Sequence, residues 1–306
     1  MMKGLERAEA FYLEAVKPMI ESEFKSVADR IAVGLVGHGS ECFGYDDELS
    51  ADHDHDGGVC LWLTNEDDKA FGFKLMRAYD RLAAAHGVYP KEKSALGGGF
   101  KGVKTIEDFY SFYVGDGLPQ TVAEWLAIPD FYLAEATNGR VFCDKLGEFT
   151  KIRDYLIGGR PEDVRLKKLA SALFYMAQYG QYNYSRCLRR GEFVAAGIAL
   201  TEFIKSAMDA AFLLCRRYAP YYKWTFRALK DLDELSFIAE DLDKLIKSPL
   251  DAAENAAVIE SVCRAVVDFM VGYGYFQKKG DYLEAYAYAV NDLIADGELR
   301  NSPVML

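Results

Sequence analysis

Hydrophobic and polar residues follow two different periods along the first half of the chain. From Leu5 to about Arg30, and again over residues 66–86, apolar residues recur at the spacing of an amphipathic helix. Thr121-Val-Ala-Glu124 has the spacing of a capping box and predicts the start of a short helix. Between these segments, short apolar runs predict four buried or half-buried strands, over residues 31–37, 59–64, 102–106 and 140–143.

The second half of the chain contains helical patterns and lacks strand-like runs. Gly158-Gly-Arg-Pro161 separates the two halves, and proline there suits the first turn of a helix. The sequence therefore predicts an N-terminal α/β domain over residues 1–157 and an all-α helical bundle over residues 158–306. The helical patterns of the bundle cover residues 161–190, 192–218, 252–273 and 281–296.

Charge and composition narrow the class of protein. The chain has 36 Lys and Arg against 47 Asp and Glu, a net charge of −11, which argues against a broad basic surface that coats long nucleic acid. No apolar run approaches the roughly 20 residues of a membrane-spanning helix, and the first residues lack the apolar core of a signal peptide. Six cysteines are scattered singly, which favours reduced thiols and a cytoplasmic protein.

The segment Gly37–Asp56 (GHGSECFGYDDELSADHDHD) carries the candidate chemistry. The first predicted strand runs into Gly39-Ser40, where glycine allows the backbone to approach a ligand closely. Asp52 and Asp54 stand two residues apart at the entry to the next strand, so both carboxylates project from one face and His53 from the other. Paired carboxylates repel each other unless a cation lies between them, and their oxygens suit Mg²⁺ bridging to substrate phosphates.

These residues resemble the signature of the polymerase-beta-type nucleotidyltransferase superfamily, in which a Gly-Ser turn is followed by a strand with paired aspartates. The Gly39-Ser40 turn, Gly44 and Ser50-x-Asp52-x-Asp54 carry the resemblance. The chain is most similar to an uncharacterised bacterial family of that superfamily, described as a domain of unknown function. Further matches cover residues 139–148, 180–188 and 217–224. The layout also resembles aminoglycoside-modifying enzymes, and it implies a nucleotidyltransferase domain with a small mixed sheet followed by a helical bundle.

The resemblance assigns roles to individual residues. It implies that Gly39 and Ser40 hold the triphosphate of an NTP, and that Asp52 and Asp54 ligate Mg²⁺ or Mn²⁺. The implied activity is transfer of a nucleoside monophosphate from the NTP to a small-molecule or protein acceptor, with release of pyrophosphate. Catalytically silent nucleotide binding, and partnership with a separate toxin or ribonuclease subunit, are the alternatives.

Two further residues are expected to contribute. Superfamily members usually add a third carboxylate on a later strand, and Glu107 is the candidate here, although a lysine stands at the centre of that predicted strand. Lys205 lies among apolar neighbours on a predicted bundle helix, where it either reaches the triphosphate or extends over the surface. His53 also departs from the apolar residue that the family usually has between its aspartates.

Other features allow two interpretations each. His38, His53 and His55 could contribute to a zinc site, but their spacing matches no zinc motif, which favours structural roles. The polar and aromatic segment Gln178–Arg186 could line an acceptor or base pocket, or pack within the fold. A local basic cluster could bind phosphate or pair with acidic residues, and it consists of Arg216, Arg217, Lys223 and Arg227.

Overall fold

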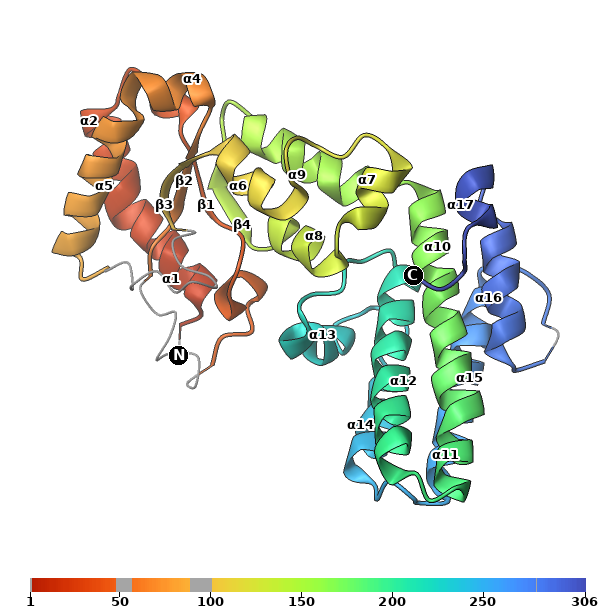
Figure 1. Ribbon diagram of the computed structural model, residues 1–306. Helices are drawn as coiled ribbons and strands as arrows, with labels where there is room; N and C mark the ends of the chain where they lie inside the picture. Colours follow the sequence, from red (N-terminus) through yellow and green to blue (C-terminus); the bar gives the residue numbers. More distant parts are fainter. Residues whose placement is uncertain (1, 48–56, 89–100, 279) are drawn as a thin grey trace. The chain divides into compact units, whose positions relative to one another are not determined.

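The computed structural model describes residues 2–47, 57–88, 101–278 and 280–306 (Figure 1). Contacts within the chain divide it into two units, Met1–Gly159 and Arg160–Leu306. The boundary predicted from the sequence falls after residue 157.

A four-stranded mixed sheet forms the centre of the first unit. Its strands are β1 (Ala32–Leu35), β2 (Cys60–Leu63), β3 (Gly102–Thr105) and β4 (Arg140–Cys143), and their order is β3-β2-β1-β4. β1 runs antiparallel to both β2 and β4, whereas β2 and β3 are parallel. All four strands predicted from the short apolar runs are therefore present, and the mixed α/β class of this half is confirmed.

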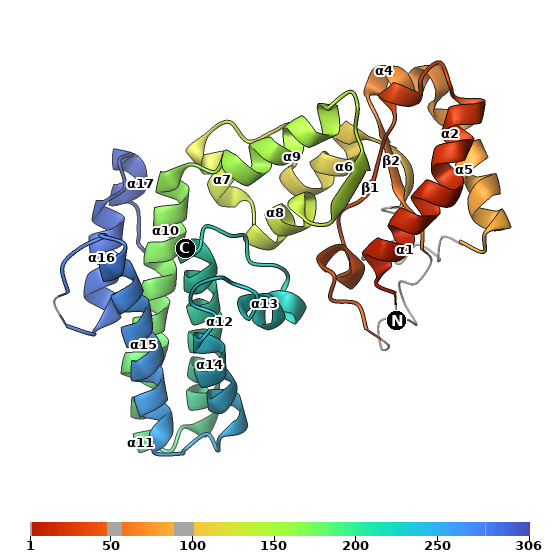
Figure 2. The same ribbon diagram turned by 180° about the vertical axis from the view of Figure 1, so that it is seen from behind.

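One face of the sheet is covered by α1 (Gly4–Phe11), α2 (Lys17–Glu23) and α5 (Phe73–Ala85), as both views show (Figures 1 and 2). A π-helical segment, Tyr12–Val16, joins α1 to α2. Another, Asp68–Gly72, joins the short α4 (Asn65–Asp67) to α5. The first helix ends at Glu23, short of the predicted Arg30, because Phe24 leaves helical geometry and is buried against Phe71.

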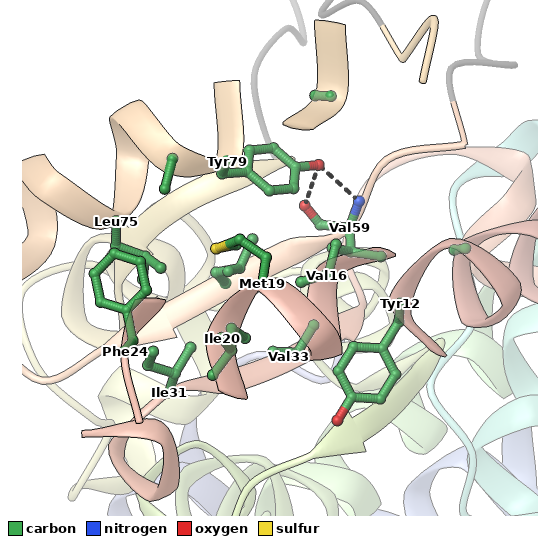
Figure 3. Packing of buried hydrophobic residues seen from close by; sticks show 14 of the residues in the cluster. Tyr12, Val16, Met19, Ile20, Phe24, Ile31, Val33, Val59, Leu75 and Tyr79 are labelled. Carbon is green, nitrogen blue, oxygen red and sulfur yellow. Dashed lines mark hydrogen bonds between the residues drawn. The ribbon is translucent and has the colours of Figure 1, made fainter. Parts of the chain in front are cut away.

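This face holds an apolar core of the unit (Figure 3). Val16 and Ile20 from the first helix pack with Val33 of β1 and Leu75 of α5 in one buried cluster. The Tyr79 hydroxyl accepts a hydrogen bond from the Val59 amide at 3.0 Å and donates one to the Val59 carbonyl at 3.2 Å. Tyr79 therefore fixes the chain at the point where it enters β2.

The opposite face is covered by α6 (Ile106–Val114), α8 (Asp130–Thr137) and α9 (Glu148–Gly158). Trp62 of β2 points to this side, where its ring stacks on Phe149 at 3.9 Å and meets Phe109 edge-on at 5.4 Å. The predicted capping box is also present at the start of α7 (Val122–Ala127), where Thr121 and Glu124 bond reciprocally. α6, α8 and α9 were not predicted from the sequence.

The second unit contains helices joined by loops, with no strand among its described residues. The long pattern predicted over residues 161–190 forms α10 (Glu162–Tyr175), a π-helical segment (Met176–Tyr184) and α11 (Ser185–Arg189). The remaining helices are α12 (Phe193–Leu214), α13 (Tyr222–Leu229), α14 (Ile238–Lys247), α15 (Glu254–Gly272), α16 (Leu283–Asp292) and α17 (Gly297–Asn301). No helix among the described residues combines the length and the apolar character needed to cross a membrane.

A polar stripe along α10 binds the backbone of the last helices. Its four side chains are spaced four residues apart and so share one side of the helix. The Lys167 ammonium is fully buried and donates at 2.9 Å to the Asn291 side chain and to two backbone carbonyls, those of Leu299 and Ser302. The same stripe includes Asp163, which accepts from the amides of residues 295 and 296, and Ser171 and Tyr175, which bond the backbone of residue 306.

Candidate functional site

The ends of several strands meet at one edge of the sheet, which we call the turn edge. β1 ends there at Leu35. β2 begins there, because its first residue, Cys60, pairs with Gly34, and β3 begins there, because its first residue, Gly102, pairs with Cys60. Leu35 also pairs with Arg140, the first residue of β4. The turn edge therefore consists of residues 36–41, 57–59, 101–102 and 138–139.

The predicted Gly39-Ser40 turn lies at this edge. Gly39 has φ +115° and ψ 150°, a backbone conformation that residues other than glycine rarely adopt. It precedes a 3₁₀ turn over Ser40–Phe43. Ser40 is only 4% exposed. Asp52, Asp54 and the neighbouring His53 lie outside the described residues, so the metal site stays a prediction. The described chain resumes at Gly57 and reaches β2 at Cys60.

A clamp from the other side of the unit holds the turn in place. The Gly37 amide donates to Asn138 Oδ1 at 2.8 Å, and Asn138 Nδ2 donates to the Gly37 carbonyl at 2.8 Å. The Gly139 amide donates to the Cys42 carbonyl at 2.9 Å. Arg153 fixes the clamp in turn, because its guanidinium donates to the carbonyls of Thr137 at 2.7 Å and Asn138 at 3.1 Å.

His38 lies within this clamp and pairs with a carboxylate. Its Nδ1 lies 3.2 Å from Oε1 of Glu135, a residue of α8 whose side chain is 5% exposed. No group of three or more His, Cys, Asp and Glu residues within the described chain is arranged to hold a metal ion. His53 and His55 lie outside that part of the chain. Among the described residues, His38 therefore pairs with Glu135.

Charged residues surround the turn on the side of α1. Lys101 pairs with Glu41 at 2.8 Å, and both side chains are largely buried, at 18% and 5% exposure. Burial raises the pKa of the neighbouring Cys60 thiol to about 11, against the opposing effect of a backbone hydrogen bond and the positive charges of Lys101 and Lys104. Lys101 therefore neutralises the buried Glu41 carboxylate beside the turn.

Asp46 supplies a second buried carboxylate on this side. Its Oδ2 accepts the Gly4 amide at the start of α1 at 2.9 Å, an arrangement that the positive end of the helix dipole stabilises. Its Oδ1 is buried, and no donor reaches it from the described residues. Glu41 and Asp46 were not singled out from the sequence, where they are two acids among many.

Glu107 does not lie with the turn. β3 begins at the turn edge with Gly102 and ends at Thr105, and Glu107 follows at the far end of the sheet. The predicted strand stops early because Thr105 caps α6, accepting a hydrogen bond from the Asp108 amide at 2.9 Å. Glu107 accepts a hydrogen bond from Asn65, which follows β2 at the same far end.

Lys205 lies on α12 of the second unit with its side chain 66% exposed and 3.7 Å from Glu202. This geometry agrees with the surface interpretation of Lys205 within its own unit. Gln181 of the polar and aromatic segment donates to Glu260 and to the Asp281 carbonyl and accepts from the Leu283 amide, so it packs helices of that unit together. The role predicted for Lys205 in nucleotide binding is not tested by these contacts.

Arg216 of the basic cluster forms a close ion pair with Glu162. The two terminal guanidinium nitrogens of Arg216 donate to Glu162 at 2.9 and 3.0 Å. Arg165 donates to the same carboxylate at 2.9 and 2.6 Å. Arg165 and Arg216 hold the pKa of Glu162 down at about 2. The ion-pair interpretation therefore holds for Arg216.

Comparison with known proteins adds one match. The sequence model of a family described as "Domain of unknown function (DUF4037)" matches residues 125–225. This range includes the clamp residues Asn138 and Arg153 and the His38 partner Glu135, but neither the Gly39-Ser40 turn nor Asp52 and Asp54. No curated protein and no solved structure matches the chain.

Proposed function

We propose that the protein is a Mg²⁺-dependent nucleotidyltransferase that moves a nucleoside monophosphate from an NTP to a small-molecule or protein acceptor. The nucleotide's phosphates would lie at the turn edge, against Gly39 and Ser40. Asp52 and Asp54 would hold the divalent cation there, Mg²⁺ or Mn²⁺. The cytoplasm is the compartment in which this activity is proposed.

One observation carries the proposal. The Gly39-Ser40 turn, which follows β1, lies at the turn edge, where the chain also enters β2. In the sequence, the paired aspartates stand between this turn and β2. A turn and a carboxylate pair that are joined to the same edge can act on one phosphate chain.

The chemistry follows from these groups. The acceptor oxygen forms a bond to the α-phosphorus, the bond to the β-phosphate oxygen breaks, and pyrophosphate and one proton are released. A bound Mg²⁺ neutralises charge on the phosphates, and paired aspartate oxygens are the hard ligands that it prefers. Amides and the hydroxyl at Gly39-Ser40 would hold the phosphates in line, so that positioning and electrostatics provide the catalysis.

A silent nucleotide-binding module is the second candidate, and Glu107 favours it. This residue was the expected third carboxylate, and it stands at the opposite end of β3 from the turn. β3 itself carries Lys104 at its centre, in register with Trp62. A module of this kind would bind NTP and metal without turnover.

Turnover of NTP labelled at the α-phosphate tests the proposal. In the presence of cell metabolites and Mg²⁺, the label should pass to an acceptor, whereas label at the γ-phosphate should leave as pyrophosphate. Asp52→Asn should abolish transfer, and Asp80→Asn, an exposed residue of α5, is the matched control. Binding of NTP without any transfer of label would favour the silent module.

A further inference from the structure

A pocket of about 340 Å³ lies in the first unit, at the end of the sheet opposite to the turn edge. α6 contributes one side of it, with Ile106, Tyr110 and Val114 at helical spacing. Ile152 of α9 and Leu118, from the loop that follows α6, complete the apolar wall. The volume is that of a small ligand pocket, and its walls are mostly hydrophobic.

The charged residues of this pocket are of one sign. Glu107, in the first turn of α6, and Glu148, in the first turn of α9, line it, and both are solvent-exposed, so they form part of its rim. No Lys, Arg or His is among the described residues that line it. Asn65 bonds Glu107 and brings an amide to the same rim.

We propose that this pocket binds a small organic cation, a primary ammonium group carried on an apolar body. The apolar body would displace water from the walls of Ile106, Val114 and Ile152, which is favourable in proportion to the apolar area buried. The ammonium group has three donors and no acceptor, and Glu107 and Glu148 offer only acceptors. A carboxylate ligand of the same shape would meet two like charges.

The proposal is independent of the proposed function. The pocket and the Gly39-Ser40 turn lie at opposite ends of β3, and the pocket uses no residue of the turn edge. Glu107, the candidate third catalytic carboxylate of the sequence analysis, has a different role in this proposal. Binding of an organic cation can be measured without NTP or a divalent metal, so either proposal can fail alone.

Three probes of the same size test the charge selectivity of the pocket: hexylammonium, hexanol and hexanoate. Methyl-labelled Ile, Leu and Val in the full chain report on the site by NMR, because Ile106 and Ile152 line the pocket. Hexylammonium should shift the methyl signals of both isoleucines until the pocket is saturated. Hexanol should bind more weakly than hexylammonium, and hexanoate should bind most weakly of the three. Equal binding of all three probes, or no shift at Ile106 and Ile152, would overturn the proposal.

Charge variants separate the pocket from unspecific attraction. Glu107→Gln and Glu148→Gln should each weaken the binding of hexylammonium up to about fivefold, because an exposed ion pair contributes little. Both variants should leave the affinity for hexanol unchanged. Asp108→Asn is the matched control, because Asp108 is exposed, adjacent to Glu107 and not part of the lining. If the double variant still prefers hexylammonium to hexanol, or Asp108→Asn removes that preference, the proposal is wrong.

A variant that fills the pocket gives an independent check. Val114→Phe places extra volume in the apolar wall and should abolish binding of hexylammonium and hexanol together. Its fold is checked by the methyl spectrum away from the pocket. The charge variants above need no change of volume, so they decide the question if Val114→Phe does not fold.

Discussion

Asn138 pairs with Gly37 through its side chain at the position where β4 would pair with β1 through its backbone. The register of the two strands pairs Leu35 with Arg140 and Gly34 with Val141, and continuing it by two residues brings Asn138 opposite Gly37. The side-chain amide accepts from the Gly37 amide and donates to the Gly37 carbonyl, both at 2.8 Å. The strand pair thus continues past β1 and supports the turn at Gly39-Ser40.

Removing this pairing should destabilise the first unit. Asn138→Ala leaves two half-buried backbone groups of Gly37 without a partner, so we expect unfolding in urea to become easier by about 1–3 kcal/mol. Asn138→Asp keeps the acceptor for the Gly37 amide but places a carboxylate oxygen against the Gly37 carbonyl. This variant should therefore be no more stable than Asn138→Ala. Asn65→Ala, at an exposed side chain of the same unit, should change stability by less than about 0.5 kcal/mol. Equal stability of Asn138→Ala and the wild type would show that the clamp contributes nothing.

Two glycines that both have a positive φ should respond differently to alanine. Gly139 has φ +63°, and a Cβ there would lie 2.0 Å from the Leu35 carbonyl oxygen. Gly147 has φ +79°, and a Cβ there would meet no atom within 4 Å. Gly147→Ala should cost only the backbone penalty of about 1–2 kcal/mol, whereas Gly139→Ala must also displace β1. Comparable melting temperatures for the two variants would contradict this account of Gly139.

Glu162 should make the second unit sensitive to acid. Its pKa lies at about 2 in the folded protein, because Arg165 and Arg216 bond the ionised carboxylate, against an ordinary value of 4.5. The unfolded chain therefore binds the proton first, and the stabilisation is complete above pH 4.5 and lost as the pH falls towards 2. Glu162→Gln should lose less stability than the wild type over that range in pH-dependent denaturation. Parallel curves for the two proteins would rule out this linkage.

Ser40→Ala separates a phosphate contact from a structural role. The proposed function predicts weaker NTP binding, by about 1.5–3 kcal/mol for one hydrogen bond to a charged group, with little change in melting temperature. Calorimetric titration with a non-hydrolysable NTP in the presence of Mg²⁺ measures the affinity, and thermal denaturation measures the melting temperature. An unchanged affinity with a lowered melting temperature would make Ser40 a structural residue of the turn.

The strands were predictable because each is a short apolar run with a distinct boundary. Cys60-Leu-Trp-Leu63 is apolar at every position since helices cover both faces of β2. The capping box at Thr121 was likewise a local signal. α6 was missed because it starts directly after β3, and its residues Phe109, Tyr110 and Tyr113 are of types that also favour strands.

The surroundings of the turn could not be predicted in the same way. Gly39-Ser40 is a local motif, but the clamp residue Asn138 lies 101 positions from Gly37 in the sequence. Asn138-Gly139 is a common turn signal, and only the register of β1 and β4 shows which residue it meets. Glu107 was expected at the site because the resemblance implies a third carboxylate on a later strand, but β3 begins at the turn edge and runs away from it, so Glu107 follows at the far end.

The central claim is that a carboxylate pair at Asp52 and Asp54 binds nucleotide through a divalent cation, and Asp54→Asn tests it most directly. Melting temperature is measured with and without a non-hydrolysable NTP plus Mg²⁺, for the wild type, Asp54→Asn and the control Asp80→Asn. At about 100 times its dissociation constant, the ligand should stabilise the wild type and the control by about 2.7 kcal/mol, and EDTA should abolish the shift. Asp54→Asn should lose the shift while its ligand-free stability stays equal or rises slightly, because one of two repelling charges is removed. A full ligand-induced shift in Asp54→Asn, or an undiminished shift of the wild type in EDTA, would contradict the claim.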